Sequence, residues 1–291
     1  MRRGLAATVI VAAVAAVAAV GCGAGSGGDL VVTGTAPATP YAGPLYVPHQ
    51  EVDEDGVEAI RTESGAAGGA LECDGEIYEG GGGPGGWGRD DGGKTPEEGL
   101  RAYFDIEVPD VPEEGYRLER REKDRALFSY DVDGRTKVAV IVAKDREGSP
   151  GWGPETSASC DPAELPASFT DSRSYEIWTD RDGDRVPITE VHTSVGSEHC
   201  DWQKAHFLSR GGDADGKGRL YGRDPEGVLP DGMLTSAYDG DVPMPVHARD
   251  TGYRHEDRAL WLVERDPSKV YVRTPDGVEI WPEVAKGMGC A

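Results

Sequence analysis

The sequence predicts an α+β fold that is mostly antiparallel β-sheet with a few short helices. Runs rich in β-branched and aromatic residues alternate with turn signals such as DVDG at 131–134 and PDG at 275–277, which is typical of short antiparallel strands. Helix signals are few and lie before residue 165. Short segments also recur in the same order in both halves, which indicates two duplicated, disulfide-closed units.

A first helix is expected over residues 57–71, after a short strand at 45–47. Val57, Ile60 and Leu71 belong to a set of apolar residues that recur near helical spacing. Several glycines within this stretch weaken the prediction, because each glycine in a helix costs about 1 kcal/mol relative to alanine.

The clearest helix start in the sequence is at Thr95. A threonine can cap a helix, Pro96 suits its first turn, and Glu98 completes a capping box. Another short helical turn is expected after Cys160. The buried stripe of the helix that begins near Thr95 is predicted to contain Leu100, Tyr103 and Phe104.

The other regular elements are predicted as strands. Two hairpins turn at 131–134 and 180–184, and a three-stranded meander closes the chain. The expected strands are 125–130, 136–143, 175–179, 185–191, 203–208, 219–221, 258–263, 269–273 and 278–281.

An internal duplication is predicted from six pairs of matching segments. The pairs are Cys73-Asp74 with Cys200-Asp201, Gly88-Arg89-Asp90 with Gly222-Arg223-Asp224, Gly115-Tyr116-Arg117 with Gly252-Tyr253-Arg254, 124–128 with 257–261, 137–140 with 269–272, and Trp152 to Cys160 with Trp281 to Cys290. A few insertions or deletions would bring these pairs into one register. Short matches also arise by chance in a biased composition, so the two copies, 73–161 and 200–290, are an expectation.

The first 22 residues combine a basic start with an uncharged apolar run. Arg2 and Arg3 precede residues 4–20, which carry no charge, and the stretch ends in Ala19-Val20-Gly21-Cys22. The run is short and alanine-rich for a membrane-spanning helix, which needs about 20 strongly apolar residues. The stretch resembles the lipobox-type signal peptide of bacterial lipoprotein precursors. An ordinary secretory signal with a chance cysteine is the alternative.

The lipoprotein resemblance implies a location and a modification. Cleavage would fall before Cys22, whose thiol would carry a diacylglyceryl group. Two or more acyl chains hold a protein on a bilayer much more firmly than one. The protein would therefore be exported and lipid-anchored at the outer face of the cytoplasmic membrane.

The remaining four cysteines fit two disulfides in an exported protein. Four cysteines allow three pairings, and the repeat favours Cys73 with Cys160 and Cys200 with Cys290, because this pairing gives each copy its own bridge. Each bridge would close a loop of about 90 residues, which the chain-entropy model values at about 4 kcal/mol.

The charge of the chain argues against nucleic acid as a partner. The sequence has 53 acidic and 30 basic residues, a net charge of −23, which becomes −25 if Arg2 and Arg3 leave with the signal peptide. This much negative charge repels nucleic acid and anionic lipid head groups. The membrane is therefore expected as a partner only through the lipid anchor.

No familiar catalytic or cofactor-binding motif occurs in the sequence. It lacks a Gly-x-Ser-x-Gly elbow, a His-Glu-x-x-His zinc helix and a Ser-x-x-Lys pair. The glycine-rich stretch 80–93 lacks the Lys-Ser/Thr of a phosphate-binding loop and is interpreted as a surface loop. No cofactor or metal is expected. Carboxylate pairs for glycoside cleavage cannot be assigned among 53 acidic residues.

Three further patterns have structural interpretations that we favour. Aspartates at 180, 182 and 184 start like a calcium loop, but Arg185 stands where its glycine belongs, so we expect a hairpin tip. Histidines at 192, 199 and 206 are expected to be scattered rather than to bind zinc. Trp87 and Trp152 could stack on a sugar from glycine-rich loops, although tryptophans beside a disulfide more often cover the edge of a core.

The expected organisation is a signal peptide (1–21), a flexible tether (22–44) and two α+β units (45–165 and 166–291). The body also resembles uncharacterised exported proteins of actinobacteria over about 64–291, in its Cys-Asp-Gly segment and hairpins, which implies no known activity. We expect a non-enzymatic lipoprotein that binds or senses an unknown envelope or extracellular partner. The alternatives are a secreted glycan-directed hydrolase that acts through two carboxylates, and a purely structural envelope protein.

Overall fold

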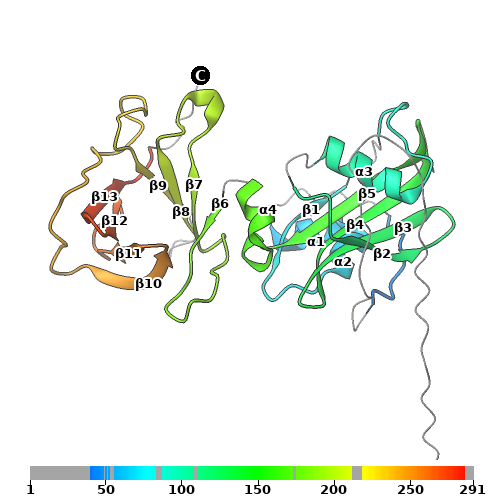
Figure 1. The fold of residues 1–291 in the computed structure, drawn as a ribbon, viewed down its shortest axis with the longest axis horizontal. Helices are drawn as coiled ribbons and strands as arrows, with labels where there is room; N and C mark the ends of the chain where they lie inside the picture. The colour runs from blue at the N-terminus through cyan, green and yellow to red at the C-terminus, as the bar shows by residue number, and fades with distance from the viewer. Residues whose placement is uncertain are drawn as a thin grey trace, which may run out of the picture.

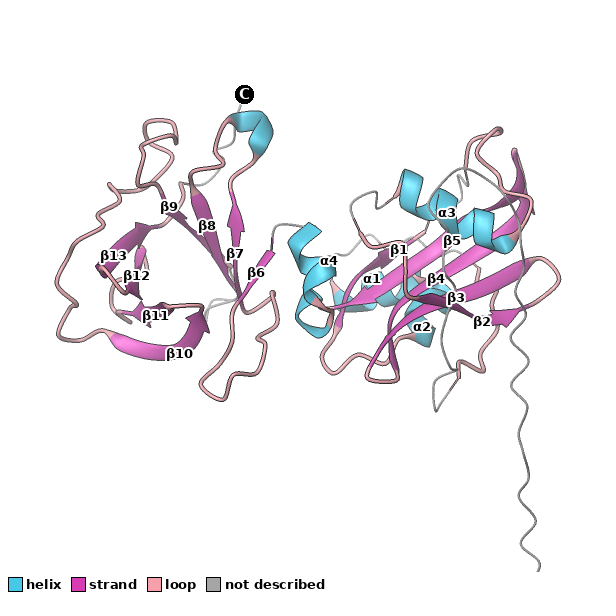
Figure 2. Ribbon diagram, viewed as in Figure 1, coloured by secondary structure: helices cyan, strands magenta, loops and turns pink. Residues whose placement is uncertain are grey.

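The computed structural model describes most of the chain after residue 39. The described residues are 40–48, 50, 52, 56–82, 87–107, 111–172, 175–211 and 218–285. The expected signal peptide, Cys22, most of the expected tether and Cys290 lie outside them. The expected fold class is confirmed in its secondary structure, because the described chain is mostly antiparallel sheet with a few short helices (Figure 2).

The strands that precede Cys160 form one antiparallel sheet, at the right in Figure 1. Its strands are β1 (Ile77–Gly81), β2 (Tyr116–Arg121), β3 (Arg125–Val132), β4 (Arg135–Arg146) and β5 (Ser149–Cys160), in the order β1-β5-β4-β3-β2. The predicted β3–β4 hairpin is present, and Asp133 and Gly134 turn it with φ of 51° and 77°. The loop expected around Trp152 is instead part of β5, because that side chain is buried beneath the first-half helices.

Helices cover both faces of this sheet. On one face, α3 (Pro96–Ile106) packs Leu100 and Phe104 against a cluster that includes Phe128 and Val140. On the other face, α1 (Val57–Glu63) and α2 (Gly65–Ala70) pack against alternate residues of the same strands, such as Leu127 and Ile141. A strand buried on both faces has a nearly continuous apolar sequence, which explains the run VAVIVA at 138–143.

The helix expected over 57–71 is present as two shorter helices. The break follows Ser64, whose hydroxyl donates to the Ile60 carbonyl, and Gly65 adopts a φ of 51° that other residues rarely tolerate. The start of α3 is as predicted, with the Glu98 N–H donating to Thr95 Oγ1 at 3.2 Å. The Glu98 carboxylate accepts from the Lys94 N–H, one residue before the cap.

The segment before α1 packs on the sheet without forming a strand, so the strand expected at 45–47 is wrong. Leu45 is buried among α2 and the central strands. Pro44 and Pro48 flank the segment and lack the N–H that strand pairing needs. Tyr41, expected in the tether, also packs here, and its N–H donates to Glu119 Oε1 at 2.6 Å.

The second half of the chain forms two four-stranded sheets that enclose a common core. One contains β6 (Tyr175–Ile177), β7 (Val191–Val195), β8 (His206–Arg210) and β9 (Arg219–Arg223), and the other contains β10 (Arg249–His255), β11 (Arg258–Leu262), β12 (Lys269–Thr274) and β13 (Gly277–Pro282). Single bridges link the two sheets at Thr179↔Arg254 and Tyr221↔Glu283. Trp178 and Trp281 are fully buried between them.

Two predictions for the second half need correction. The strand expected at 185–191 is mostly irregular, and β6 pairs with β7 instead. Pro187 lies within that stretch and cannot donate to a ladder, which explains the late start of β7. The closing meander has a fourth strand, β10, that the sequence analysis did not predict.

Three of the six matching pairs lie on corresponding strands, but Gly88-Arg89-Asp90 lies in a turn and Gly222-Arg223 in β9, and the two halves differ as whole units. The meanders β2–β5 and β10–β13 carry the matches at 115–117, 124–128 and 137–140 and their counterparts. Helices cover the first meander, whereas a second sheet faces the other one. The expectation of two duplicated units is therefore not confirmed.

The predicted Cys73–Cys160 disulfide is present, with 5.3 Å between the two Cα atoms. It links the segment before β1 to the end of β5. The strands β1 and β5 also pair with each other. Cys200 is disulfide-bonded as well. Cys290 lies outside the described residues, so its pairing with Cys200 stays a prediction.

We expect replacement of both Cys73 and Cys160 by alanine to lower the free energy of unfolding by about 2–5 kcal/mol, because an open loop of this length gives the unfolded chain more entropy. Urea denaturation of the double variant measures this. Cys22→Ala, which leaves the bridge intact, is the control. A loss below about 1 kcal/mol would show that the bridge adds little to stability.

Candidate functional site

The two tryptophans considered for sugar stacking are buried. Trp87 is 4% exposed and Trp152 is 3% exposed. The Trp87 indole N–H donates to the Pro150 carbonyl at 2.9 Å, and Trp152 packs in the core beneath α3. Stacking on a sugar needs a free ring face, so the alternative interpretation, that both cover the edge of a core, fits the structure.

The histidines and the alternating aspartates have separate local roles. His192 Nδ1 donates to the Ile188 carbonyl at 2.7 Å, whereas His206 Nδ1 lies 3.4 Å from Glu176 Oε1. Asp180 Oδ1 accepts from the backbone N–H groups of Asp182 and Asp184, at 2.8 and 3.0 Å. Asp180 therefore stabilises the hairpin tip, as expected.

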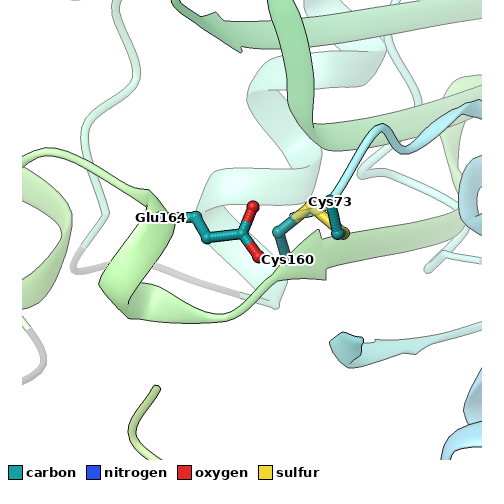
Figure 3. Close-up of side chains that lie close together, drawn as sticks. All are labelled: Cys73, Cys160 and Glu164. Carbon is teal, nitrogen blue, oxygen red and sulfur yellow. A yellow bond between two sulfur atoms is a disulfide. The ribbon is translucent and has the colours of Figure 1, made fainter. Parts of the chain in front are cut away.

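One group of potential metal ligands occurs among the described residues: Cys73, Cys160 and Glu164 (Figure 3). Both sulfurs are joined in the disulfide and are not thiolates, the form in which cysteine binds metals. The Glu164 carboxylate accepts from the backbone N–H of Asp74 and from Lys137 Nζ, at 2.7 and 2.5 Å. This arrangement is best explained as a structural ion-pair cluster of Lys137, Asp74 and Glu164 beside the disulfide.

Lys137 is the central residue of this ion-pair cluster. Its side chain is 3% exposed, and Nζ donates to the Glu72 carbonyl at 2.9 Å and to Asp74 Oδ2 at 2.8 Å, besides Glu164. Hydrogen bonds from Lys137 and Arg135 lower the pKa of Asp74 to about 2. The buried ammonium is thus fully paired, as a buried charge must be.

A second charged network joins the two sheets of the second half. Glu176 on β6 contacts His206 on β8 and accepts from Thr193 on β7, and its Oε2 lies 3.3 Å from Arg258 on β11 in the facing sheet. Burial acts to raise the pKa of Glu176, but the bonds from His206 and Thr193 and the charge of Arg258 lower it to about 2. The ion pair therefore favours packing of the two sheets.

A wide groove of about 860 Å³ lies on the second half, between the 180–182 turn and β10. Arginines and carboxylates line it together, and several are already paired. Arg181 donates to the Asp250 carbonyl at 3.2 Å, and the Tyr253 hydroxyl donates to Glu190 at 3.0 Å. The described lining of the groove has neither an apolar wall nor one dominant charge.

A smaller cavity of about 100 Å³ lies in the first half, between α3 and α4 (Ala167–Ser172) on the α3 face of the sheet. We call it the α3–α4 cavity. Its described lining comprises Glu79, Gly80, Tyr103, Glu107, Val111, Tyr116, Val138, Ser157, Ala158, Ser159, Pro162, Leu165 and Phe169. The wall is mostly apolar and aromatic, with a few polar groups, which is typical of small-molecule sites.

Strand register explains the floor of this cavity. Glu79 on β1 faces Ser159 on β5, which faces Val138 on β4, so the three lie in one row across the sheet. Ser157 and Ser159 are short, and the β4 residues paired with them are the larger Val140 and Val138. The small side chains of β5 therefore leave space that α3 and α4 do not fill.

The end of α3 supplies the second carboxylate. Glu107 is the C-cap residue of this helix, and its Oε2 accepts from the Ser157 hydroxyl at 3.4 Å, the outer limit of a hydrogen bond. Burial raises the pKa of Glu107, the Ser157 bond lowers it, and the negative charge of Glu79 raises it further. No lysine, arginine or histidine is among the described residues that line the cavity.

Aromatic rings form a connected group beside the cavity. Tyr103, Tyr116 and Phe169 line it, and Phe104 and Tyr130 connect them, with successive ring centroids 4.6 to 5.6 Å apart. Such contacts hold aromatic side chains in fixed positions. The cavity wall is thus a rigid part of the first-half core.

Sequence reasoning did not identify Glu79 or Glu107 as site residues. Each is one of 53 acidic residues and belongs to no motif. Their proximity depends on the pairing of β1 with β5, strands that lie about 80 residues apart in the chain. A pattern within one segment contains no signal for such a contact.

Comparisons with known proteins give no assignment. No family model, no curated protein and no solved structure matches the chain. Among the described residues, no helix combines the length and the apolar character needed to cross a membrane. The function must therefore be argued from the site itself.

The Glu176 network yields a pH prediction. Its carboxylate has a pKa of about 2 when folded and near 4.5 otherwise, so its ion pairs stabilise the fold above pH 4.5 and lose that effect as the pH falls toward 2. We expect Glu176→Gln to lower the free energy of unfolding at pH 7, by about 3 kcal/mol at most, and to have little effect near pH 2.

Denaturation of both proteins across this pH range tests the prediction. The control is Glu256→Gln, which changes an exposed glutamate 3.9 Å from the same arginine, Arg258. A difference between wild type and Glu176→Gln that stays constant from pH 7 to pH 2 would contradict the proposed role of the ionised carboxylate.

Proposed function

We propose that this protein is an exported, lipid-anchored binding protein that holds a small organic ligand in the α3–α4 cavity without transforming it. The observation that carries this proposal is the cavity itself, whose lining combines aromatic side chains with Glu79 and Glu107. A cavity lined by apolar and aromatic side chains with a few polar groups is the first candidate for a small-molecule site, although at about 100 Å³ this one is smaller than the pockets of about 300–1,000 Å³ that hold whole ligands.

The cellular location of the protein is proposed from its first 22 residues. Their basic start, uncharged apolar run and terminal Gly21-Cys22 resemble a lipoprotein signal peptide. A disulfide within the first half is consistent with folding in an oxidising compartment. The envelope or extracellular space would then be the source of the ligand or partner.

A second candidate function is hydrolysis through two carboxylates. Glu79 and Glu107 line one cavity, and a glutamate with a raised pKa beside another carboxylate is the arrangement of a general acid and its partner. The cavity of about 100 Å³ is smaller than one of about 150 Å³ that holds benzene. A glycosidase must hold a sugar on each side of the bond that it cleaves. The small volume of the cavity therefore favours a binding function over a hydrolase.

We also propose that the two meanders descend from one duplicated segment. In the first sheet, β1 lies beside the last strand of the meander β2–β5, and in the second half β9 is bridged at the last strand of the meander β10–β13. The first strand pair of each meander, β2–β3 and β10–β11, also contains a register shift. The helices and the β6–β9 sheet would be separate additions. An experimental structure in which the matched segments fall on non-corresponding strands would refute this.

We expect Cys22→Ala to move the protein from the membrane fraction to the soluble fraction, because the acylated thiol is the only anchor we propose. Fractionation of expressing cells and immunoblotting measure the distribution. The control is Cys73→Ala, which removes a different cysteine. Equal membrane retention of Cys22→Ala and wild type would refute lipid anchoring.

Ligand binding is tested with three probes of similar shape: tetramethylammonium, tert-butanol and pivalate. We expect at least one to raise the melting temperature of the purified full chain in detergent micelles. A probe at 100 times its Kd stabilises by about 2.7 kcal/mol, which corresponds to roughly 5 °C or more at this size.

The matched variants locate the effect. Ser159→Leu places a larger side chain in the α3–α4 cavity and should abolish the shift, whereas Ser236→Leu changes an exposed loop residue and should preserve it. A flat response to all three probes, or a shift that Ser159→Leu leaves unchanged, would contradict the proposed function.

A further inference from the structure

We infer that the α3–α4 cavity recognises an alkylated ammonium group, the cationic head of a ligand whose remaining part extends into solvent. This inference rests on the proposed function, because it names the ligand class of the same cavity. Four properties of the site support it: its charge, the weak hydrogen bonding of one carboxylate, its aromatic wall and its size.

The charge of the lining favours a cation. Glu79 and Glu107 both line the cavity, and the described lining contains no basic residue. An anion would meet two carboxylates in a chain with a net charge of −23. Both glutamates are exposed, so they attract a cation toward the cavity and repel an anion.

The environment of Glu107 favours a cation over a neutral ligand. Glu107 is an exposed residue of the lining, and the donor to its carboxylate, the Ser157 hydroxyl, lies 3.4 Å away. A neutral ligand would remove more water from this carboxylate without supplying a charge. That loss of hydration is unfavourable for an ionised carboxylate, whereas a bound ammonium would supply an opposite charge.

The aromatic wall favours an alkylated ammonium over a metal ion or a fully hydrated cation. Tyr103 and Phe169, which are 6% and 5% exposed, line the cavity together with Leu165 and Val138, whereas Tyr116 is fully buried behind them. Aromatic rings attract organic cations, and quaternary ammonium groups in particular are bound by clusters of them. An alkylated ammonium also presents apolar methyl or methylene surface to the aliphatic side chains.

The size of the cavity limits the buried part to a head group. At about 100 Å³, it offers less space than a cavity of about 150 Å³ that holds benzene. A trimethylammonium group, which is about the size of benzene, would fill this space, and a complete amino sugar or peptide would not fit in it. Glu79 and Glu107 are the exposed residues of the described lining, so a longer substituent would extend past them into solvent.

The test compares choline with 3,3-dimethyl-1-butanol, which has the same shape but carries carbon in place of the charged nitrogen. Equilibrium binding to the full chain is measured for wild type, Glu79→Gln, Glu107→Gln and Ser159→Leu. The control is Glu147→Gln, which removes the same charge from an exposed turn residue. Circular dichroism and melting curves confirm that each variant is folded.

We expect wild type to bind choline at least tenfold more tightly than the neutral isostere. Glu79→Gln and Glu107→Gln should each weaken choline binding at least fivefold and leave the isostere unaffected. Glu147→Gln should change neither. Ser159→Leu should abolish binding of both compounds, because it fills the cavity.

The outcomes separate the two proposals. If the isostere binds as tightly as choline and Ser159→Leu still abolishes binding, the cationic ligand class is wrong but the binding function stands. If choline binds but neither glutamine variant weakens it, the assigned role of the carboxylates is wrong. If wild type binds neither choline, the isostere nor pivalate, both proposals fail.

Discussion

Burial of the central strands on both faces is the constraint on which the first half depends. Residues 138–143 of β4 are apolar at every position, so neither face of the sheet can be left in water. The two helical layers are therefore required, and each apolar side chain they bury contributes about 1.5–3 kcal/mol. The cavity arises where this cover is incomplete, over β5 between α3 and α4.

The second half is attached through the segment that follows the disulfide. The Asp161 carboxylate accepts from the N–H groups of Ala163 and Ile188, at 2.8 and 3.1 Å, and Arg185 donates to the Leu165 carbonyl. Burial raises the pKa of Asp161, and its backbone hydrogen bonds oppose that rise. Residues far apart in the sequence thus fix the position of the 161–165 turn.

Local sequence signals predicted the elements better than their assembly. The capping box at Thr95 and the turn at Asp133-Gly134 were correct, because neighbouring residues determine such features. The Trp152 loop was wrong because burial under α3 overrides its glycines. Two features could not be predicted: the packing of two sheets in the second half, and the presence of Glu79 and Glu107 in the lining of one cavity. Both depend on pairing between distant segments of the chain.

The cavity and the attachment of the second half share one segment. Leu165 lines the cavity with its side chain, while its carbonyl accepts from Arg185 of the second half. Phe169 lines the same cavity from α4, the helix that precedes β6 and contacts it. A ligand that restricts Leu165 and Phe169 therefore also restricts the segment to which the second half is joined, because one short stretch of backbone carries both contacts.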